Sequence, residues 1–401
     1  MNYDLIALLA FIFLLSLYIR KKRKNLELQK ILYPVVYMLL YKTSIGIKLM
    51  NWIGKKYRKL IITIGYCFVG LGFCGLLAVS YSILSTMIRF VLSPGTTATG
   101  MYLLYPGTQI PGIGYLSFWY WLIGLFVTAA IHEFSHGIVA VAHKVRIKSS
   151  GFAILGIIAP IFPVAFVDPD EKELSKIQDV AQHSIFAAGP MINLILALII
   201  FAILPYVADS TGTRLAPFEE RITMPVGFSF DIINSTMPAG KAGLVTGALI
   251  NKVGNESVKD ANLFVERLYF CASPGENWSM GNENRTYAIE TIKSPADNTR
   301  AYIGIENIRN VRVVKQEYRW FSGLFYWIKG LFKWIFTLNF FVGLSNLLPI
   351  FITDGSKMLL VALESNIRDK KKAVKVWKII NSVFLFAIII GLLSSYIKKL
   401  F

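Results

Sequence analysis

Residues Leu116–Ala142 read LSFWYWLIGLFVTAAIHEFSHGIVAVA, and this stretch decides the fold. At ~1.5 Å per residue, a helix of this length crosses the roughly 30 Å of hydrocarbon in a bilayer. His132, Glu133 and His136 are its only imidazole or carboxylate side chains. Such groups are costly in hydrocarbon unless they pair or bind a metal ion. The stretch therefore predicts a membrane helix that carries a functional cluster.

The composition of the whole chain is typical of a membrane protein. Of its 401 residues, 55% are hydrophobic and 16% are charged, and several more apolar runs are long enough to span a bilayer. The expected spans are Tyr3–Ile19, Leu60–Ile88, Leu116–Ala142, His183–Val207, Trp320–Leu348 and Trp377–Ile397. We therefore expect a polytopic α-helical protein of the cell membrane, with about six transmembrane helices.

The net charge of +18 does not indicate a nucleic-acid partner. Twelve Lys and Arg lie between Arg20 and Lys59 against the single acid Glu27, whereas the segment Asp209–Asn310 carries ten basic and twelve acidic residues. Basic clusters beside apolar spans are the positive-inside signature of cytoplasmic segments. We expect no nucleic acid, basic loops in the cytoplasm, and Asp209–Asn310 on the outside.

The segment Asp209–Asn310 is expected to form a separate domain. All four Asn-x-Ser/Thr sequons of the chain fall in it, at Asn234, Asn255, Asn277 and Asn284, as an external position would allow. Its short apolar runs, separated by Gly, Pro and Asn, predict a small mixed α/β fold. The expected organisation is an N-terminal helix with a basic interfacial segment (1–59), a first part of the catalytic core (60–208), the external domain (209–310), and a second part of the core with the last helix (311–401).

The residues His132-Glu133-Phe134-Ser135-His136 form an HExxH motif. Histidines at i and i+4 project from one face of a helix, so both imidazoles can bind one metal ion. Glu133 can then act as the general base toward water at that metal. The motif predicts a catalytic zinc site, which usually has three protein ligands and one open position.

The third ligand must come from another part of the chain. His143 lacks the spacing of an extended zincin motif and lies at an expected interface, and His183 lies at the end of a cytoplasmic loop. Asp354 is better placed. At ~1.5 Å per residue, Leu116–His132 covers about 24 Å and Trp334–Asn346 about 18 Å, so both helices, entered from outside, pass the midplane before the site. We expect Asp354 to meet the two histidines toward the cytoplasmic side.

The combination of motifs resembles the site-2 protease family of intramembrane zinc metalloproteases. Besides HExxH, the chain has Asn-x-x-Pro-x-x-x-x-Asp-Gly at Asn346–Gly355 and Gly-Pro-x-x-Asn at Gly189–Asn193. Three stretches of the insert resemble the carboxylate loop and following strand of PDZ domains, which points to PDZ-containing members of prokaryotic, archaeal type. They are Pro238-Ala239, Ala242–Leu244 and Gly247–Ile250. The resemblance covers about Leu116–Leu360.

The resemblance implies one zinc ion per chain, bound by His132, His136 and Asp354, with Glu133 as the general base. It also implies that the substrates are transmembrane segments of membrane proteins, which are cut within or near the membrane. The PDZ-like domain would bind peptides or filter substrates by size.

The resemblance gives further residues a role. Asn346 and Asn193 would orient substrate or stabilise the oxyanion; the alternatives are that Asn346 caps the backbone freed by the following proline and that Asn193 makes a helix-packing hydrogen bond. The segment Ser149–Asp168, broken by glycines and prolines, resembles the membrane-inserted β-hairpin of the family, which can pair with an unwound substrate.

Two departures and two rival functions remain open at this point. The residues Phe351–Thr353 before Asp354 are less rich in proline than in many family members, and the PDZ match is partial. A zinc transporter can also place a histidine–glutamate string in a span, but it needs successive metal sites, and the chain has four histidines. A catalytically inactive PDZ-bearing scaffold is the other alternative, and the complete HExxH-plus-Asp set argues against it.

Overall fold

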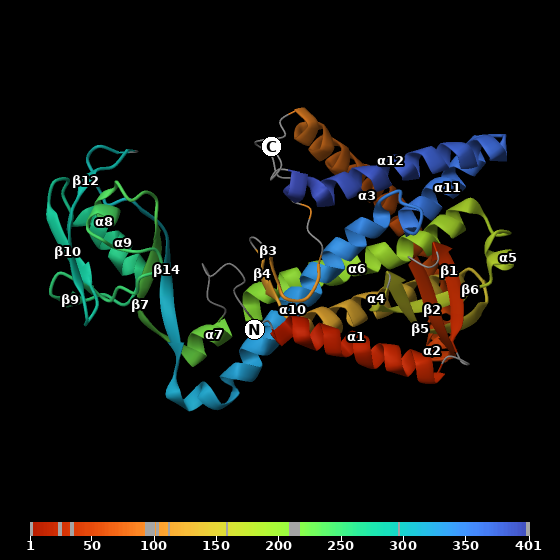
Figure 1. Ribbon diagram of the computed structural model, residues 1–401, viewed down its shortest axis with the longest axis horizontal. Coiled ribbons are helices and arrows are strands. Elements are labelled where there is room, and N and C mark those ends of the chain that lie inside the picture. Colours follow the sequence, from red (N-terminus) through yellow and green to blue (C-terminus); the bar gives the residue numbers. More distant parts are fainter. Residues whose placement is uncertain are drawn as a thin grey trace. The chain divides into compact units, whose positions relative to one another are not determined.

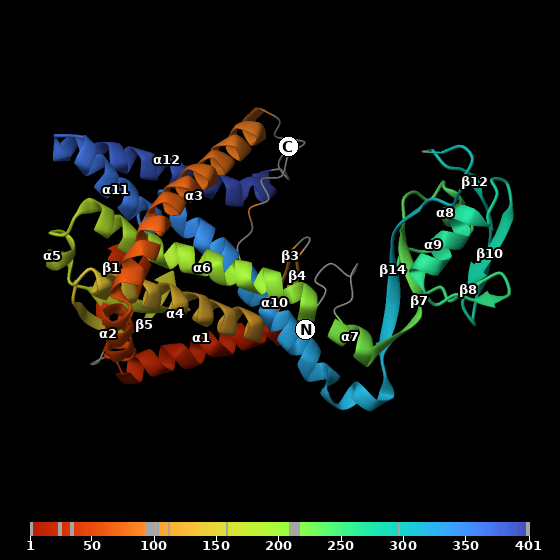
Figure 2. The same ribbon diagram turned by 180° about the vertical axis from the view of Figure 1, so that it is seen from behind.

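The computed structural model describes residues 3–22, 26–32, 36–92, 101, 104–110, 113–157, 159–207, 217–295 and 297–397. The chain divides into two compact units, one made of Met1–Phe201 with Gly330–Phe401 and the other of Ala202–Lys329 (Figures 1 and 2). The expected external domain, Asp209–Asn310, falls in the second unit, and its first residues, 209–216, lie outside the described ranges.

The first unit is mainly helical. Its helices are α1 (Tyr3–Lys22), α2 (Ile47–Lys56), α3 (Arg58–Leu92), α4 (Phe118–Ala142), α5 (Glu171–Leu174), α6 (Asp179–Val207), α10 (Arg319–Leu347), α11 (Asp354–Asn366) and α12 (Lys370–Ile397). Within the described ranges, five helices are long and apolar enough to cross a membrane, namely α1, α3, α4, α6 and α12. The chain is an integral membrane protein with several candidate spans.

The expected fifth span corresponds to α10, which is not among those five candidates. The helix has 29 residues, but Lys329, Lys333, Asn339 and Asn346 interrupt its apolar composition. The buried positions of its second half include Asn339 and Gly343, so this half packs against protein rather than lipid. Its composition therefore reflects helix–helix packing, which a hydropathy pattern does not register.

Helices α4, α6 and α10 lie side by side in both views (Figures 1 and 2). Glycines allow this close approach. A Cβ atom at Gly343 of α10 would lie 3.0 Å from the carbonyl oxygen of Pro190 on α6, and one at Gly124 of α4 would lie 2.6 Å from a methyl group of Leu338 on α10. The three helices that carry the HExxH, GPxxN and NxxP motifs are therefore in direct contact.

A four-stranded antiparallel sheet completes the first unit. The expected hairpin at Ser149–Asp168 forms strands β5 (Ile147–Ile157) and β6 (Ala159–Pro169). The two other strands are β1 (Glu27–Leu32) and β2 (Val36–Thr43), and the order across the sheet is β1-β2-β5-β6. Within the described residues no strand lies beyond β6. The edge of β6 faces α4, since a Cβ atom at Gly137 would lie 3.3 Å from Val167.

The sequence did not predict β1 and β2, because the segment 30–59 reads as an interfacial stretch interrupted by lysines. Strand β2 pairs along its whole length with β5, from Val36 opposite Ile157 to Thr43 opposite Ser150. A pairing between segments so far apart leaves no local signature in β2 or β5, and β1 pairs with β2 alone. A two-stranded ribbon, β3 (Thr108–Ile110) with β4 (Gly114–Leu116), precedes α4.

The second unit is a small mixed α/β fold. Its elements are α7 (Pro217–Ile222), β7 (Thr223–Ile232), α8 (Pro238–Lys241), β8 (Lys252–Val253), β9 (Glu256–Ser257), α9 (Ala261–Phe270), β10 (Asn277–Gly281), β11 (Thr286–Glu290), β12 (Ile292–Lys293), β13 (Ala301–Tyr302), β14 (Ile305–Val314) and the 3₁₀ turn η2 (Gln316–Tyr318). Its core stacks Phe228 of β7 on Phe264 of α9, with ring centroids 4.4 Å apart. All four sequon asparagines are exposed.

Candidate active site

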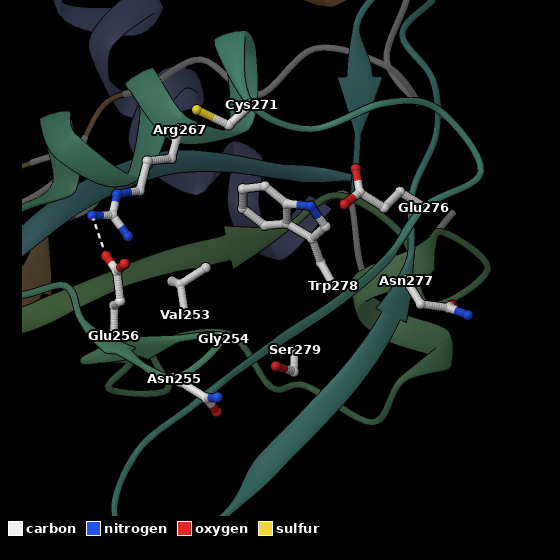
Figure 3. Close-up of a pocket in the computed structure, with 10 residues that line it drawn as sticks. All are labelled: Val253, Gly254, Asn255, Glu256, Arg267, Cys271, Glu276, Asn277, Trp278 and Ser279. Atoms are coloured by element: carbon white, nitrogen blue, oxygen red, sulfur yellow. Dashed lines mark ion pairs between the residues drawn. The ribbon is translucent and has the colours of Figure 1, made fainter.

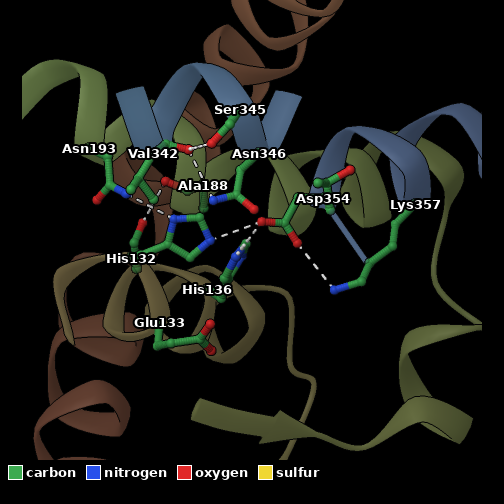
Figure 4. Close-up of polar contacts among 12 residues, drawn as sticks. His132, Glu133, His136, Ala188, Asn193, Val342, Ser345, Asn346, Asp354 and Lys357 are labelled. Carbon is green, nitrogen blue, oxygen red and sulfur yellow. Dashed lines mark hydrogen bonds and ion pairs between the residues drawn. The ribbon is translucent and has the colours of Figure 1, made fainter. Parts of the chain in front are cut away.

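The three expected metal ligands meet at one point inside the first unit. The Nε2 atoms of His132 and His136, both on α4, lie 2.9 and 3.1 Å from Oδ2 of Asp354 at the start of α11 (Figure 4). His132 and Asp354 are buried. Within the described ranges, these residues are the only group of three or more His, Cys, Asp or Glu side chains whose ligand atoms converge, all within 4.8 Å of one another.

The hydrogen bond of His136 leaves its Nε2 atom free to bind a metal ion. Its Nδ1 lies 2.6 Å from the carbonyl oxygen of Ile185 on α6. A carbonyl oxygen only accepts, so Nδ1 carries the proton and donates it. The lone pair of Nε2 is therefore directed at the cluster, which is the usual arrangement for a metal-binding histidine.

His132 has a comparable partner behind it. Asn193 of α6 is fully buried, and its amide group lies 3.1 Å from Nδ1 of His132. With the amide nitrogen toward the ring, the Asn193 oxygen has no partner in the described residues. Turning the amide by 180° lets its oxygen accept from Nδ1–H, which gives that oxygen a partner and frees Nε2 of His132 as a ligand. Asn193 thus lies behind the ligand, in the position of a helix-packing hydrogen bond.

Gly189 of the GPxxN motif leaves space for the cluster. A Cβ atom at this position would lie 2.4 Å from Nε2 of His136 and 2.5 Å from Nε2 of His132. The Cβ atom of any other residue would collide with both ligand nitrogens. The first residue of the motif, Gly189, therefore leaves space for the ligand nitrogens, and the last residue, Asn193, forms a hydrogen bond to a ligand.

Asp354 is held by the start of its helix and by a lysine. Thr353 is the N-cap of α11 and accepts a hydrogen bond from the Ser356 backbone N–H, which fixes the turn that presents Asp354. The other carboxylate oxygen, Oδ1, accepts from the ammonium group of Lys357 at 3.1 Å. Lys357 was not predicted from the sequence. Its signal was the i,i+3 spacing from Asp354 in the first turn of a helix, where two side chains share a face.

Glu133 lies next to the cluster but turns toward the sheet. Its Oε2 accepts a hydrogen bond from the backbone N–H of Val167 on β6 at 3.0 Å (Figure 4 draws its side chain). Asn346, near the end of α10, donates one amide N–H to the carbonyl oxygen of Val342 on its own helix at 3.0 Å.

The two other histidines lie elsewhere. Nε2 of His143 lies 2.8 Å from the hydroxyl of Ser184, and Nε2 of His183 lies 3.1 Å from the carbonyl oxygen of Met358. Each therefore has its own partner, and neither belongs to the converging group.

The residues fit a zinc ion. Two neutral imidazole nitrogens and one carboxylate oxygen are a usual catalytic donor set. Ligand atoms about 2.0–2.1 Å from a tetrahedral zinc are about 3.3 Å apart, and the N···O separations here are 2.9 and 3.1 Å. The space kept by Gly189 is consistent with this assignment.

A groove of about 600 Å³ lies within the second unit, between α9 and one end of β10 (Figure 3). The indole of Trp278 lies between the side chains of Arg267 and Glu276, and Arg267 pairs with Glu256 across the groove. The residues Asn255 and Asn277, both sequon asparagines, also line it. The groove has the dimensions of a ligand pocket but no converging metal ligands among the described residues.

Comparison with known proteins agrees with the geometry. A family model described as peptidase family M50 matches residues 120–391, a segment that includes the HExxH, GPxxN and NxxP motifs. An uncharacterized protein of Methanocaldococcus jannaschii is 31% identical over 206 residues, which make up 49% of this chain and 51% of that protein. The chain thus spans about half the length of the curated relative it matches.

Proposed function

The chain belongs to peptidase family M50, and on that premise we propose that it is an intramembrane zinc metalloprotease of the site-2 protease type. It hydrolyses peptide bonds within or near transmembrane segments of other membrane proteins. The observation that carries the proposal is the convergence of His132, His136 and Asp354 in an apolar helical core. A buried set of ionisable groups in such a place indicates function, because it is costly without one.

The reaction is the addition of water to the scissile carbonyl, followed by loss of the amine. His132, His136 and Asp354 would hold one zinc ion per chain, which would supply Lewis-acid polarisation and lower the pKa of water. Glu133 takes a proton from the attacking water as the C–O bond forms. The tetrahedral intermediate then collapses, the C–N bond breaks, and Glu133 gives the proton to the leaving amine.

The edge of β6 is the proposed place for the substrate backbone. A transmembrane helix shields its carbonyl groups by internal hydrogen bonds, so it must unwind before cleavage. An extended segment can add to a free strand edge by backbone hydrogen bonds, and β6 offers such an edge beside Glu133. Asn346, which has a second amide N–H and a carbonyl, is proposed to orient this segment.

The second unit is proposed to be a PDZ-like domain that faces outward, consistent with the archaeal-type members expected from the sequence. Strand β7 already pairs with β14 on one edge and with Ile250 on the other. Peptide binding by strand addition at β7 is therefore disfavoured. The groove between α9 and β10 is the better candidate for a peptide, and size filtering of substrates is the alternative.

The proposed topology places the catalytic cluster toward the cytoplasm, and α10 acts as the sixth membrane helix. The rival function of zinc transport is disfavoured, because the described part of the chain has one convergent group of ligand-type side chains. A transport path needs several such sites in succession. The substrate class, the peptide partner and the orientation are all parts of the proposal.

The test is cleavage of a synthetic transmembrane peptide by the purified full-length protein in detergent. We expect wild-type protein to cut the peptide, and 1,10-phenanthroline followed by added zinc to abolish and restore cleavage. Glu133→Gln should lower the rate by about 10²–10⁴ with its zinc content unchanged. The matched control, Glu283→Gln at an exposed turn of the second unit, should behave like the wild type.

The rival functions give different outcomes. A transporter would show zinc flux into proteoliposomes and no cleavage at any zinc concentration. An inactive scaffold would show neither activity. If Glu133→Gln cleaves at nearly the wild-type rate, the protein is still a protease, but Glu133 is not its general base.

A further inference from the structure

The ammonium group of Lys357 is a positive charge next to the metal ligands. The family motifs assign no role to this lysine. It donates to Oδ1 of Asp354 at 3.1 Å, while Oδ2 of the same carboxylate faces the two histidines. The two oxygens of Asp354 are thus divided between a metal position and a lysine. Figure 4 shows Lys357 on the side of Asp354 away from Asn193.

The contact leaves most of the ammonium available. An ammonium group has three N–H donors, and one of them faces Asp354 Oδ1 in the described contacts. The Lys357 side chain is 52% exposed, whereas that of Asp354 is 6% exposed. The aromatic ring of Phe186 lies 5.6 Å from the ammonium and holds it near the site. The remaining N–H groups are therefore accessible to a ligand that binds beside Asp354.

The other side-chain donors near the cluster are differently placed. Asn193 is fully buried behind His132 and is used by that ring. Asn346 uses one amide N–H on its own helix, and it is a neutral donor. A charged donor adds the attraction of a full positive charge to its hydrogen bond with a developing oxyanion.

We propose that Lys357 is a catalytic residue, and that its ammonium group donates a hydrogen bond to the oxyanion of the tetrahedral intermediate. As water adds to the scissile carbonyl, the electron pair of the C=O bond moves to oxygen, and Lys357 stabilises the resulting charge. The lysine stays protonated throughout, because Glu133 carries the transferred proton. This assignment rests on the proposed protease function and deepens it.

The geometry explains why the lysine also contacts Asp354. The carboxylate holds the long, flexible side chain in one rotamer before substrate arrives, so that little entropy is lost in the transition state. The helical spacing of three residues provides this contact without any other element.

The experiment compares Lys357→Met, Lys357→Arg and wild type, with Lys375→Met on an exposed face of α12 as the matched control. Zinc content, kcat and KM are measured with the synthetic transmembrane peptide in detergent. We expect Lys357→Met to lower kcat by about 10²–10³, with zinc content and KM within twofold of the wild type. Lys357→Arg keeps the charge, and its kcat should be at least tenfold higher than that of Lys357→Met.

A binding measurement separates a catalytic from a merely structural role. A peptidyl phosphonate carries the charged tetrahedral oxygens of the intermediate, whereas a small hydroxamate only chelates the metal. We expect Lys357→Met to weaken phosphonate binding at least tenfold and to leave hydroxamate binding unchanged.

Two results would overturn the proposal. One is a kcat of Lys357→Met within threefold of the wild type. The other is a loss of zinc in proportion to the loss of activity, which would mean that the lysine only holds Asp354. Failure of the protease proposal itself looks different, since wild type would then be inactive as well.

Discussion

The carboxylate of Glu133 accepts a hydrogen bond from the backbone N–H of Val167 at 3.0 Å, which joins the HExxH helix to the edge strand of the sheet. Residues on a strand edge point their N–H and C=O groups outward at every second position. The N–H group of Val167 points outward, so the N–H group of Ala165 does as well. The next such position is Pro163, which has no N–H. Of these three positions, two have an outward N–H, and the proposed base binds the one at Val167.

Val167→Pro should therefore lower activity through Glu133. Proline fits the extended backbone of an edge strand and removes the N–H, together with the valine side chain that packs against the core around Val139. A hydrogen bond to a charged group contributes about 1.5–3 kcal/mol, so we expect kcat to fall roughly 10- to 100-fold as the carboxylate loses its fixed position. The measurement is the turnover of the synthetic transmembrane peptide.

Ala165→Pro is the matched control for this prediction. It removes the neighbouring outward N–H, which does not contact Glu133, and should affect KM more than kcat if a substrate strand pairs there. Equal effects of the two prolines on kcat would show that the contact with Glu133 has no special importance.

Gly189→Ala should prevent metal binding. The added methyl group would lie 2.4 and 2.5 Å from the ligand nitrogens of His136 and His132, closer than any real Cβ contact, so at least one ring must move. We expect zinc content to fall at least tenfold after dialysis against a mild chelator. The control is Gly323→Ala on α10, where a Cβ atom meets no atom within 4 Å. A Gly189→Ala protein with full zinc content would contradict the site geometry.

The parts of the site that follow from local spacing were predictable from the sequence. The i,i+4 histidines share a helical face in any helix, and Asp354 follows a proline that ends a span. The partners of those ligands were not predictable. The Ile185 carbonyl, the space at Gly189 and the Val167 N–H depend on how α6 and β6 pack against α4. These contacts join residues far apart in the chain and leave no periodic pattern.

The fold shows the same division. The apolar runs predicted the helices closely, because length and hydropathy are local properties. The hairpin at Ser149–Asp168 was expected only from its resemblance to a family. Strand β2 was missed because its partner β5 lies more than a hundred residues away, and β1, which pairs with β2 alone, was missed with it. The role of Asn193, in substrate binding or in helix packing, stays a prediction, and its amide group lies 3.1 Å from Nδ1 of His132.

Asn193 should act through zinc affinity. Asn193→Leu keeps the approximate shape but removes the acceptor for Nδ1–H of His132, and loss of such a partner typically costs about 10–100-fold in metal affinity. Asn193→Asp keeps an acceptor oxygen and should retain affinity close to the wild type. Both are measured by competition with a chromophoric chelator, and thermal unfolding serves as a check on folding. Equal affinities for the Leu variant and the wild type would be inconsistent with the inferred hydrogen bond.

The orientation of the chain can be tested at Ser257, an exposed residue of β9 in the second unit. Charge asymmetry places this unit outside. The three cysteines Cys67, Cys74 and Cys271 are free and exposed, so they are first replaced by serine. Ser257→Cys should then react with a membrane-impermeant maleimide on intact cells, while Lys371→Cys, an exposed residue in the basic first turn of α12, should react only after lysis. The reverse pattern would invert the topology and place the proposed active site on the outer side. The pairing of the two cysteines matters, because a leaky membrane labels both positions and an inaccessible β9 labels neither.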